Sequence, residues 1–147
     1  MRMAGSHLDF DLELAVKEDS DNPVYYVQYA HARICSILKL LAEDGITVKK
    51  YAEIKAELLK EEAEITLLKK LAELPEEIKA AAVSREPARM TRYVIELATD
   101  FHSFYNSCRV KGCDEELTNA RLKLIESVKT VIEGVLGMLK IDAPEKM

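Results

Sequence analysis

Apolar residues recur every three or four positions along most of the chain, which is the spacing that forms one face of an α-helix. The pattern predicts a short amphipathic helix over residues 8–18 and a longer helix over residues 23–43. The longer helix has Pro23 at its first position, an Asp-Asn pair just before it as candidate caps, and Gly45 just beyond its end. The first third of the chain is therefore expected to be helical.

The middle of the chain continues the helical pattern. Residues 47–74 are helix-forming throughout, although the pattern also allows a break near residues 61–63. Pro75 is expected to begin a further helix, because proline is favoured in the first turn and disfavoured in a helix interior. Buried faces in this region are predicted at Ile54, Leu58, Ile65, Leu68 and Leu71.

Two more helices are predicted in the last part of the chain. Pro87 opens a helix that reaches about Val110, with one apolar stripe formed by Met90, Val94, Leu97, Phe101 and Cys108. Asp114 caps a last helix that reaches about Leu139 and is expected to bury Leu117, Leu124, Val128, Val131 and Val135. Since no useful segment alternates with period two, we expect an all-α bundle of five to six helices with essentially no sheet.

Composition narrows the class of protein. At 147 residues, the chain is long enough for one domain with a single core. Its three cysteines have no CxxC spacing, so neither a disulfide framework nor a zinc site is indicated, and a reducing, cytoplasmic setting fits. No run approaches the roughly 20 apolar residues of a membrane-spanning helix. A net charge of −5 argues against nonspecific nucleic-acid binding.

The helix over residues 23–43 carries two distinct faces. At about 100° per residue, one arc holds the expected core stripe of Val27, Ala30, Ile34, Ile37, Leu38 and Leu41. A second arc holds Tyr26, Tyr29 and Arg33. Two rings and a guanidinium on successive turns could stack single-stranded bases and donate to a base edge. Alternatively, the tyrosines line the rim of the core and Arg33 pairs with a nearby acid.

Four sequence motifs carry a resemblance to a known family. The run DNPVYYVQYAHARICSIL, with SHLDFDLELA before it and RYVIELATDFHSFYNSCRV and APEKM after it, resembles the C-terminal, DALR-type anticodon-binding domain of arginyl-tRNA synthetase, a class I aminoacyl-tRNA synthetase. The resemblance covers almost the whole chain. It implies one anticodon-binding domain over residues 1–147, in which residues 1–20 comprise the connector from the catalytic domain and the first short helix. The catalytic domain, with its HIGH and KMSK signatures, is absent from this sequence.

The resemblance implies a role in translation and protein biosynthesis, as the RNA-binding part of an arginine-tRNA ligase. Its partners would be the anticodon stem-loop of tRNA-Arg and the enzyme's own catalytic domain, with no DNA and no membrane involved. This chain would be non-catalytic and hold no cofactor, whereas the full-length enzyme would bind ATP and Mg. The family's pocket maps onto Tyr26, Tyr29, Arg33, Tyr105 and Met147. The family often has Arg before the final Met, where this chain has Lys146, so a forked contact there is not expected.

Other residues allow both a functional and a structural interpretation. His102 could border the RNA pocket or be a hydrogen-bonded histidine at the core rim. Arg89 and Arg92, with Arg85 on the same arc, could meet tRNA phosphates or pair with local acids, for example Arg92 with Glu96.

Metal binding and catalysis have little support in the sequence. His31 and Cys35 lie four residues apart, but no further metal ligand has a recognisable spacing, so no metal site is expected. No catalytic motif is present. A second hypothesis for the whole chain is a helical protein-interaction module that docks a partner on the tyrosine face.

Overall fold

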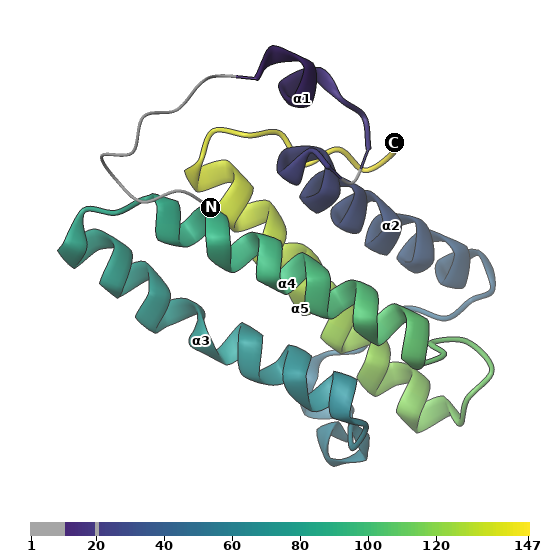
Figure 1. The fold of residues 1–147 in the computed structure, drawn as a ribbon. Helices are drawn as coiled ribbons and strands as arrows, with labels where there is room; N and C mark the ends of the chain where they lie inside the picture. Colours follow the sequence, from purple (N-terminus) through teal and green to yellow (C-terminus); the bar gives the residue numbers. More distant parts are fainter. Residues whose placement is uncertain (1–10, 20) are drawn as a thin grey trace.

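A computed structural model of the chain describes residues 11–19 and 21–147, and these residues are helical wherever they are regular (Figure 1). Four long helices dominate: α2 (Pro23–Glu43), α3 (Glu62–Ser84), α4 (Ala88–Ser107) and α5 (Glu115–Met138). A five-residue helix, α1 (Leu12–Val16), precedes them, and the part of the first predicted helix before residue 11 lies outside the described residues. The described residues contain no strand, which confirms the all-α class, and they form four long helices and one short one, where the sequence predicted five to six helices.

The four long helices share one core, in which α4 contacts α2, α3 and α5. Figure 1 shows α4 crossing the middle of the molecule, with α3 along one side and α2 along the other. The predicted stripe of α4 is buried along its whole length, from Met90 to Cys108. In α5, Leu124, Val128 and Val135 are buried as predicted, whereas Leu117 and Val131 are half-buried at its edge. No described helix is both long enough and apolar enough to cross a bilayer.

Residues 47–60 do not form the predicted helix. Only two short 3₁₀ turns occur there, at Tyr51–Glu53 and Ala56–Leu58, and Leu59 is buried in the core. The second turn packs against α5, so this segment has to cross one end of the bundle between α2 and α3. Helix propensity is a weak preference that such tertiary packing overrides. The permitted break near residues 61–63 is where α3 begins.

Pro75 lies inside α3 and does not begin a new helix, so that prediction was wrong. A proline in a helix interior removes one backbone hydrogen bond, but α3 packs along α4 on both sides of it. Five residues before Pro75, the Tyr93 hydroxyl of α4 donates to the Lys70 carbonyl at 2.8 Å. The unbroken helix directs Leu67 into the core, whereas Leu68, predicted to be buried, is 36% exposed.

A buried ion pair fixes the start of α3 against α5. Arg121 donates from Nε to Glu64 Oε1 at 2.6 Å and from Nη1 to the Arg109 carbonyl at 2.6 Å. Glu64 also accepts from the Glu61 backbone N–H at 2.9 Å, which caps the first turn of α3. The side chains of Glu64 and Arg121 are 0% and 8% exposed, so one contact joins α3, α5 and the loop between α4 and α5.

Candidate nucleic-acid interface

The two faces predicted for α2 are both present in the structure. Val27, Ala30, Ile34 and Leu41 are buried against α4 and α5, and Ile37 and Leu38 pack at the edge of this core. Asn22 starts the helix by accepting from the Val24 N–H at 3.1 Å, and Gly45 ends it in a left-handed conformation with φ of 80°. This frame sets the direction in which Tyr26, Tyr29 and Arg33 leave the helix.

The tyrosine face of α2 meets two aromatic side chains of α4. The ring of His102 lies 4.9 Å from Tyr26 and 6.0 Å from Tyr29, measured between ring centroids, and it stacks on Tyr29 at 28°. The Tyr26 hydroxyl lies 3.5 Å from Thr99 Oγ1. We call Tyr26, Tyr29, Arg33, His102 and Tyr105 the aromatic cluster. The structure thus brings together five of the eight residues predicted to bind RNA.

Arg33 links the two helices of the aromatic cluster. Its guanidinium carbon lies 4.0 Å from the centroid of the Tyr105 ring, and Nη1 donates to the Tyr29 hydroxyl at 3.2 Å. No ion pair joins Arg33 to a described acidic residue, so the predicted alternative of an acidic partner for Arg33 does not hold there. A guanidinium stacked on an aromatic ring keeps the donors at its edge available for a ligand.

The surroundings of His102 favour its neutral form. Burial, and secondarily the positive charge of Arg33, lower the pKa of His102 below its ordinary value of 6.5. Its Nε2 atom is buried and makes no hydrogen bond to another described residue. An unpaired buried polar atom costs free energy, so a site for a ligand or a water beside it would be favoured.

The cluster borders an open hollow of about 410 Å³, lined by Tyr25, Tyr26, Tyr29, Arg33, His102 and Asn106. Tyr29 is 40% exposed, so part of its ring is available to a ligand. Aromatic planes with one forked cation suit a flat, polar-edged group such as an unstacked base. A hollow of similar size between α3 and α4 is lined by Glu61, Glu62 and Asp100, and these acids would repel a polyanion.

Two residues of this hollow, Tyr25 and Asn106, were not among the predicted site residues. Asn106 belongs to the FYN motif but was not singled out, and its side chain can both donate and accept hydrogen bonds. Tyr25 lies about 100° from Tyr26 around α2, outside the predicted arc. A wider arc on the helical wheel would have included it.

Met147 is not part of the aromatic cluster in this structure. The segment after α5 returns to α2, where Gln28 Nε2 donates to the Asp142 carbonyl at 2.8 Å and His31 Nδ1 lies 2.9 Å from the Pro144 carbonyl oxygen. Figure 1 shows this segment running from the end of α5 towards α2. Met147 is 51% exposed, and no described ring contact or hydrogen bond joins it to the tyrosines.

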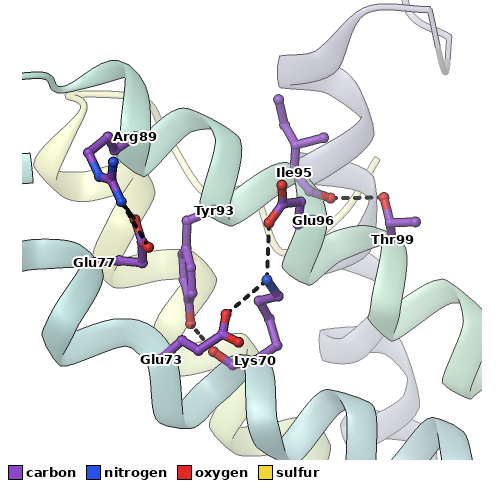
Figure 2. A network of polar contacts seen from close by, with 8 residues as sticks. All are labelled: Lys70, Glu73, Glu77, Arg89, Tyr93, Ile95, Glu96 and Thr99. Atoms are coloured by element: carbon purple, nitrogen blue, oxygen red, sulfur yellow. Dashed lines mark hydrogen bonds and ion pairs between the residues drawn. The ribbon is translucent and has the colours of Figure 1, made fainter. Parts of the chain in front are cut away.

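Arg89 and Arg92 lie away from the cluster, at the start of α4. Figure 2 shows the Arg89 side chain directed at Glu77 of α3, with an N···O distance of 3.1 Å. The same figure shows Lys70 between Glu73 and Glu96, at 2.9 and 3.0 Å. Although burial alone would lower the Lys70 pKa, the hydrogen bonds to both acids raise it. Glu96 therefore pairs with Lys70, and Arg92 makes no ion pair within the described part of the chain.

The other candidate chemistry is not assembled in the described residues. His31 and Cys35 approach each other, with the sulfur 3.9 Å from the ring nitrogens, but no group of three or more His, Cys, Asp or Glu side chains there could hold a metal ion. The three cysteines, Cys35, Cys108 and Cys113, are free. Burial is the main cause that raises the pKa of Cys35 and of Cys108, so both thiols favour the protonated form.

The chain is similar to known proteins along nearly its whole length. Residues 27–147 match the family described as "DALR anticodon binding domain". The arginine–tRNA ligases of Ruminiclostridium cellulolyticum and Caldanaerobacter subterraneus are 55% and 54% identical over 99% and 100% of this chain. The chain spans 26% of the length of each. The solved arginyl-tRNA synthetase of Thermus thermophilus superposes with a TM-score of 0.78 and 29% identity, covering 95% of this chain and 24% of that one.

Proposed function

The chain belongs to the DALR anticodon binding domain family of arginine–tRNA ligases, and from this premise we propose that it binds the anticodon arm of tRNA-Arg. The observation that supports this proposal best is the aromatic cluster, in which rings from α2 and α4 surround one forked cation beside an open hollow. Such a site holds bases that have left a helical stack, which is how most sequence-specific RNA recognition works.

In the proposed complex, the middle anticodon base enters the hollow and lies against the exposed part of Tyr29. Stacking of one base on an aromatic ring contributes about 1 to 3 kcal/mol and tolerates any base. Discrimination would come from hydrogen bonds at the base edge, for which Arg33 and Asn106 are the available groups. Tyr105 holds the guanidinium group of Arg33 in place. Met147 packs against the anticodon loop from the neighbouring side of α2.

Phosphates of the anticodon arm would meet cations at the start of α4, at a distance from the aromatic cluster. Of the two predicted arginines at the start of α4, Arg89 already pairs with Glu77, which restricts its movement. Arg92 is exposed and makes no ion pair within the described residues, so it can reach a phosphate at little cost. We therefore assign the main phosphate contact to Arg92 and a weaker phosphate contact to Arg89.

The rest of the reaction would occur in the remaining three quarters of a longer enzyme. There, ATP and Mg would support formation of arginyl adenylate and transfer of arginine to the tRNA 3′ end. This chain would align the tRNA with that catalytic domain, and residues 1–20 would contribute the connection. The free cysteines fit the proposed cytoplasmic location. A protein-docking role for the tyrosine face is not favoured, because the family match already assigns the chain to an RNA-binding domain.

The proposal can be tested by an NMR titration of the labelled 147-residue chain with two RNA hairpins. One is the anticodon stem-loop of a tRNA-Arg, and the other has its middle anticodon base changed. Signals of Tyr29, Arg33 and Met147 should shift with the first hairpin and much less with the second. Tyr51, an exposed tyrosine of the first 3₁₀ turn, serves as the control and should stay unchanged with both.

Three outcomes would count against the proposal. If neither hairpin moves the cluster signals at millimolar RNA, the face does not bind an anticodon loop. If both hairpins shift Tyr29 equally, the face binds RNA but does not recognise the middle base. An equal shift of Tyr51 would indicate adsorption to the whole surface.

A further inference from the structure

His31 lies on α2 between the core and the returning C-terminal segment, and it is buried to 1% exposure. A buried histidine needs a partner for its ring nitrogens. Here Nδ1 lies 2.9 Å from the Pro144 carbonyl oxygen. Because a carbonyl only accepts, Nδ1 must carry the proton and donate it. The Cys35 sulfur lies 3.9 Å from each of the two ring nitrogens, so the Pro144 carbonyl is the one short polar contact of this ring among the described residues.

The segment that His31 holds is anchored at several points. Just after α5, Lys140 has a left-handed conformation, and the Ile141 N–H donates back to the Leu136 carbonyl at 2.9 Å, which turns the chain sharply. Apolar side chains then pack at the edge of the core, namely Leu139, Ile141 and Ala143. Beyond Ala143, the printed sequence has only four more residues, and the His31–Pro144 bond is the last described hydrogen bond before Met147.

The burial of Ala32 indicates where the end of this segment lies. At about 100° per residue, Ala32 points about 140° away from Val27 of the core stripe and only about 60° from Tyr29. An alanine on the outer side of a helix should be exposed, yet Ala32 is 4% exposed. The described segment bonded to this part of α2 is the one that contains Asp142 and Pro144. It therefore continues over Ala32, towards the side of α2 that carries Tyr29.

We propose that His31 is a positioning residue for RNA binding: its bond to Pro144 holds residues 145–147 over the Ala32 side of α2 before RNA arrives, so that Met147 has only a short distance to move to reach Tyr29. The proposal rests on the proposed function, because it assigns His31 a role in that same site. His31 does not touch RNA in this arrangement. Its effect is to remove the conformational freedom that the segment would otherwise lose on binding, and such preorganisation increases affinity without any new contact.

Three variants of the 147-residue chain separate this role from others. His31→Phe keeps a ring but has no donor for Pro144, whereas His31→Asn places an amide N–H near the position of Nδ1. Gln28→Ala removes the second anchor and lies nearer the surface, so it tests the same segment if the buried substitution impairs folding. Ser36→Ala is the matched control, because Ser36 bonds only to the Ala32 carbonyl of its own helix.

The first measurement follows the methyl signal of Met147 in free protein. We expect a shifted, ordered signal in the wild type, a signal near the random-coil position in His31→Phe, and an intermediate one in Gln28→Ala. His31→Asn should show part of the wild-type shift of Met147. The control, Ser36→Ala, should show the full wild-type shift. Met138, an exposed methionine at the end of α5, is the internal reference. An unchanged Met147 signal in both His31→Phe and Gln28→Ala would overturn the proposal.

The second measurement is a double-mutant cycle with the cognate hairpin. His31→Phe should weaken binding about three- to tenfold, the range of one net hydrogen bond, and Met147→Ala by a similar factor. In the Met147→Ala background, His31→Phe should add less than about a twofold effect, because the group that it positions is gone. Equal losses in both backgrounds would mean that His31 acts through the fold of α2 and not through Met147.

The two proposals fail in distinguishable ways. If the wild type does not bind the hairpin, the proposed function fails, whatever the methyl signals show. If it binds and the cycle shows no coupling, only the role of His31 is overturned.

Discussion

Arg33 is the residue on which the proposed site depends most, since it contacts aromatic side chains of both helices. It stacks on Tyr105 of α4 and donates to Tyr29 of α2. Either contact alone would restrict the side chain, and together they fix the direction of the fork. A guanidinium group held in this way loses little conformational freedom when it exchanges water for the edge of a base. Such preorganisation favours a selective contact.

Arg33→Lys should therefore weaken binding of the cognate hairpin even though the charge is kept. Lysine can neither stack as a plane nor donate as a fork, and a lost hydrogen bond to a charged group costs about 1.5 to 3 kcal/mol, so we expect roughly a tenfold or greater loss. Binding is measured by fluorescence anisotropy. The control is Lys39→Met, which removes an exposed cation of the same helix and should change affinity less than about twofold. Equal losses in both variants would mean that only net charge matters.

His102 supplies a prediction on pH. Because burial and Arg33 lower its pKa, folding favours the neutral ring, and His102 contributes stability that is fully present above its ordinary pKa of 6.5 and is lost as pH falls through the lower folded value. Imidazole proton shifts followed by NMR should titrate below pH 6.5. In Arg33→Met the midpoint should rise part of the way towards 6.5, since burial, the larger cause, remains. A midpoint at or above 6.5 in the wild type would contradict the buried geometry.

At the scale of elements, helix boundaries with local side-chain signals were predictable and those set by packing were not. Asn22, Gly45 and Asp114 marked their helix ends correctly. By contrast, Arg85 at the end of α3 and Lys140 just after α5 have φ of 56° and 59°, left-handed positions that usually favour glycine, so no local signal marked these two helix ends. Pro75 wrongly predicted the start of a helix, because contacts with α4 stabilise α3 on both sides of this proline.

The same distinction applies to the site. Tyr26, Tyr29 and Arg33 share one helix, so the periodicity of α2 predicted their common face. His102 and Tyr105 were named from a motif, and only the packing of α4 on α2 brings them to that face. The bond between His31 and Pro144 spans 113 positions in the sequence. No local pattern contains such a contact, which is why His31 was considered only as a metal ligand.

The Glu64–Arg121 pair should be the most sensitive contact between elements. Arg121→Met leaves the Glu64 carboxylate buried without its counter-charge, and breaking a buried pair in this way typically costs about 3 to 5 kcal/mol. We expect a loss of this size in the free energy of unfolding, measured with urea. Adding Glu64→Gln to Arg121→Met should recover part of it, because the glutamine oxygen can still accept from the Glu61 N–H that caps α3.

A surface pair provides the comparison for that measurement. Lys49 lies 3.1 Å from Glu115, and both side chains are well exposed. Lys49→Met should therefore change stability by less than about 1 kcal/mol. If Arg121→Met is equally mild, the carboxylate is either hydrated or protonated in the variant, and the contact does not hold α3 against α5.

At the scale of the whole molecule, the net charge of −5 limits how the chain can bind a polyanion. Proteins that rely on many phosphate contacts lose affinity steeply with salt, because each neutralised phosphate releases condensed counterions. This chain instead has an aromatic cluster with one guanidinium group, that of Arg33, and its net charge is negative. Stacking and base-edge contacts should therefore supply a large share of its affinity, and these depend little on ionic strength.

The salt dependence of hairpin binding tests how the affinity is divided between phosphate contacts and the stacking and base-edge contacts. If Arg92 meets one phosphate and Arg89 adds a weaker second contact, the slope of log K against log salt should lie between about −0.7 and −1.4, since each single-strand phosphate contributes about −0.7. Arg92→Met should make the slope shallower by about 0.7 and weaken cognate and altered hairpins alike. Tyr29→Ala should lower affinity for the cognate hairpin at every salt concentration and leave the slope unchanged, because a ring releases no counterions. A wild-type slope steeper than about −4, insensitive to Tyr29→Ala, would instead indicate attraction to an extended basic surface and would remove the aromatic cluster from RNA recognition.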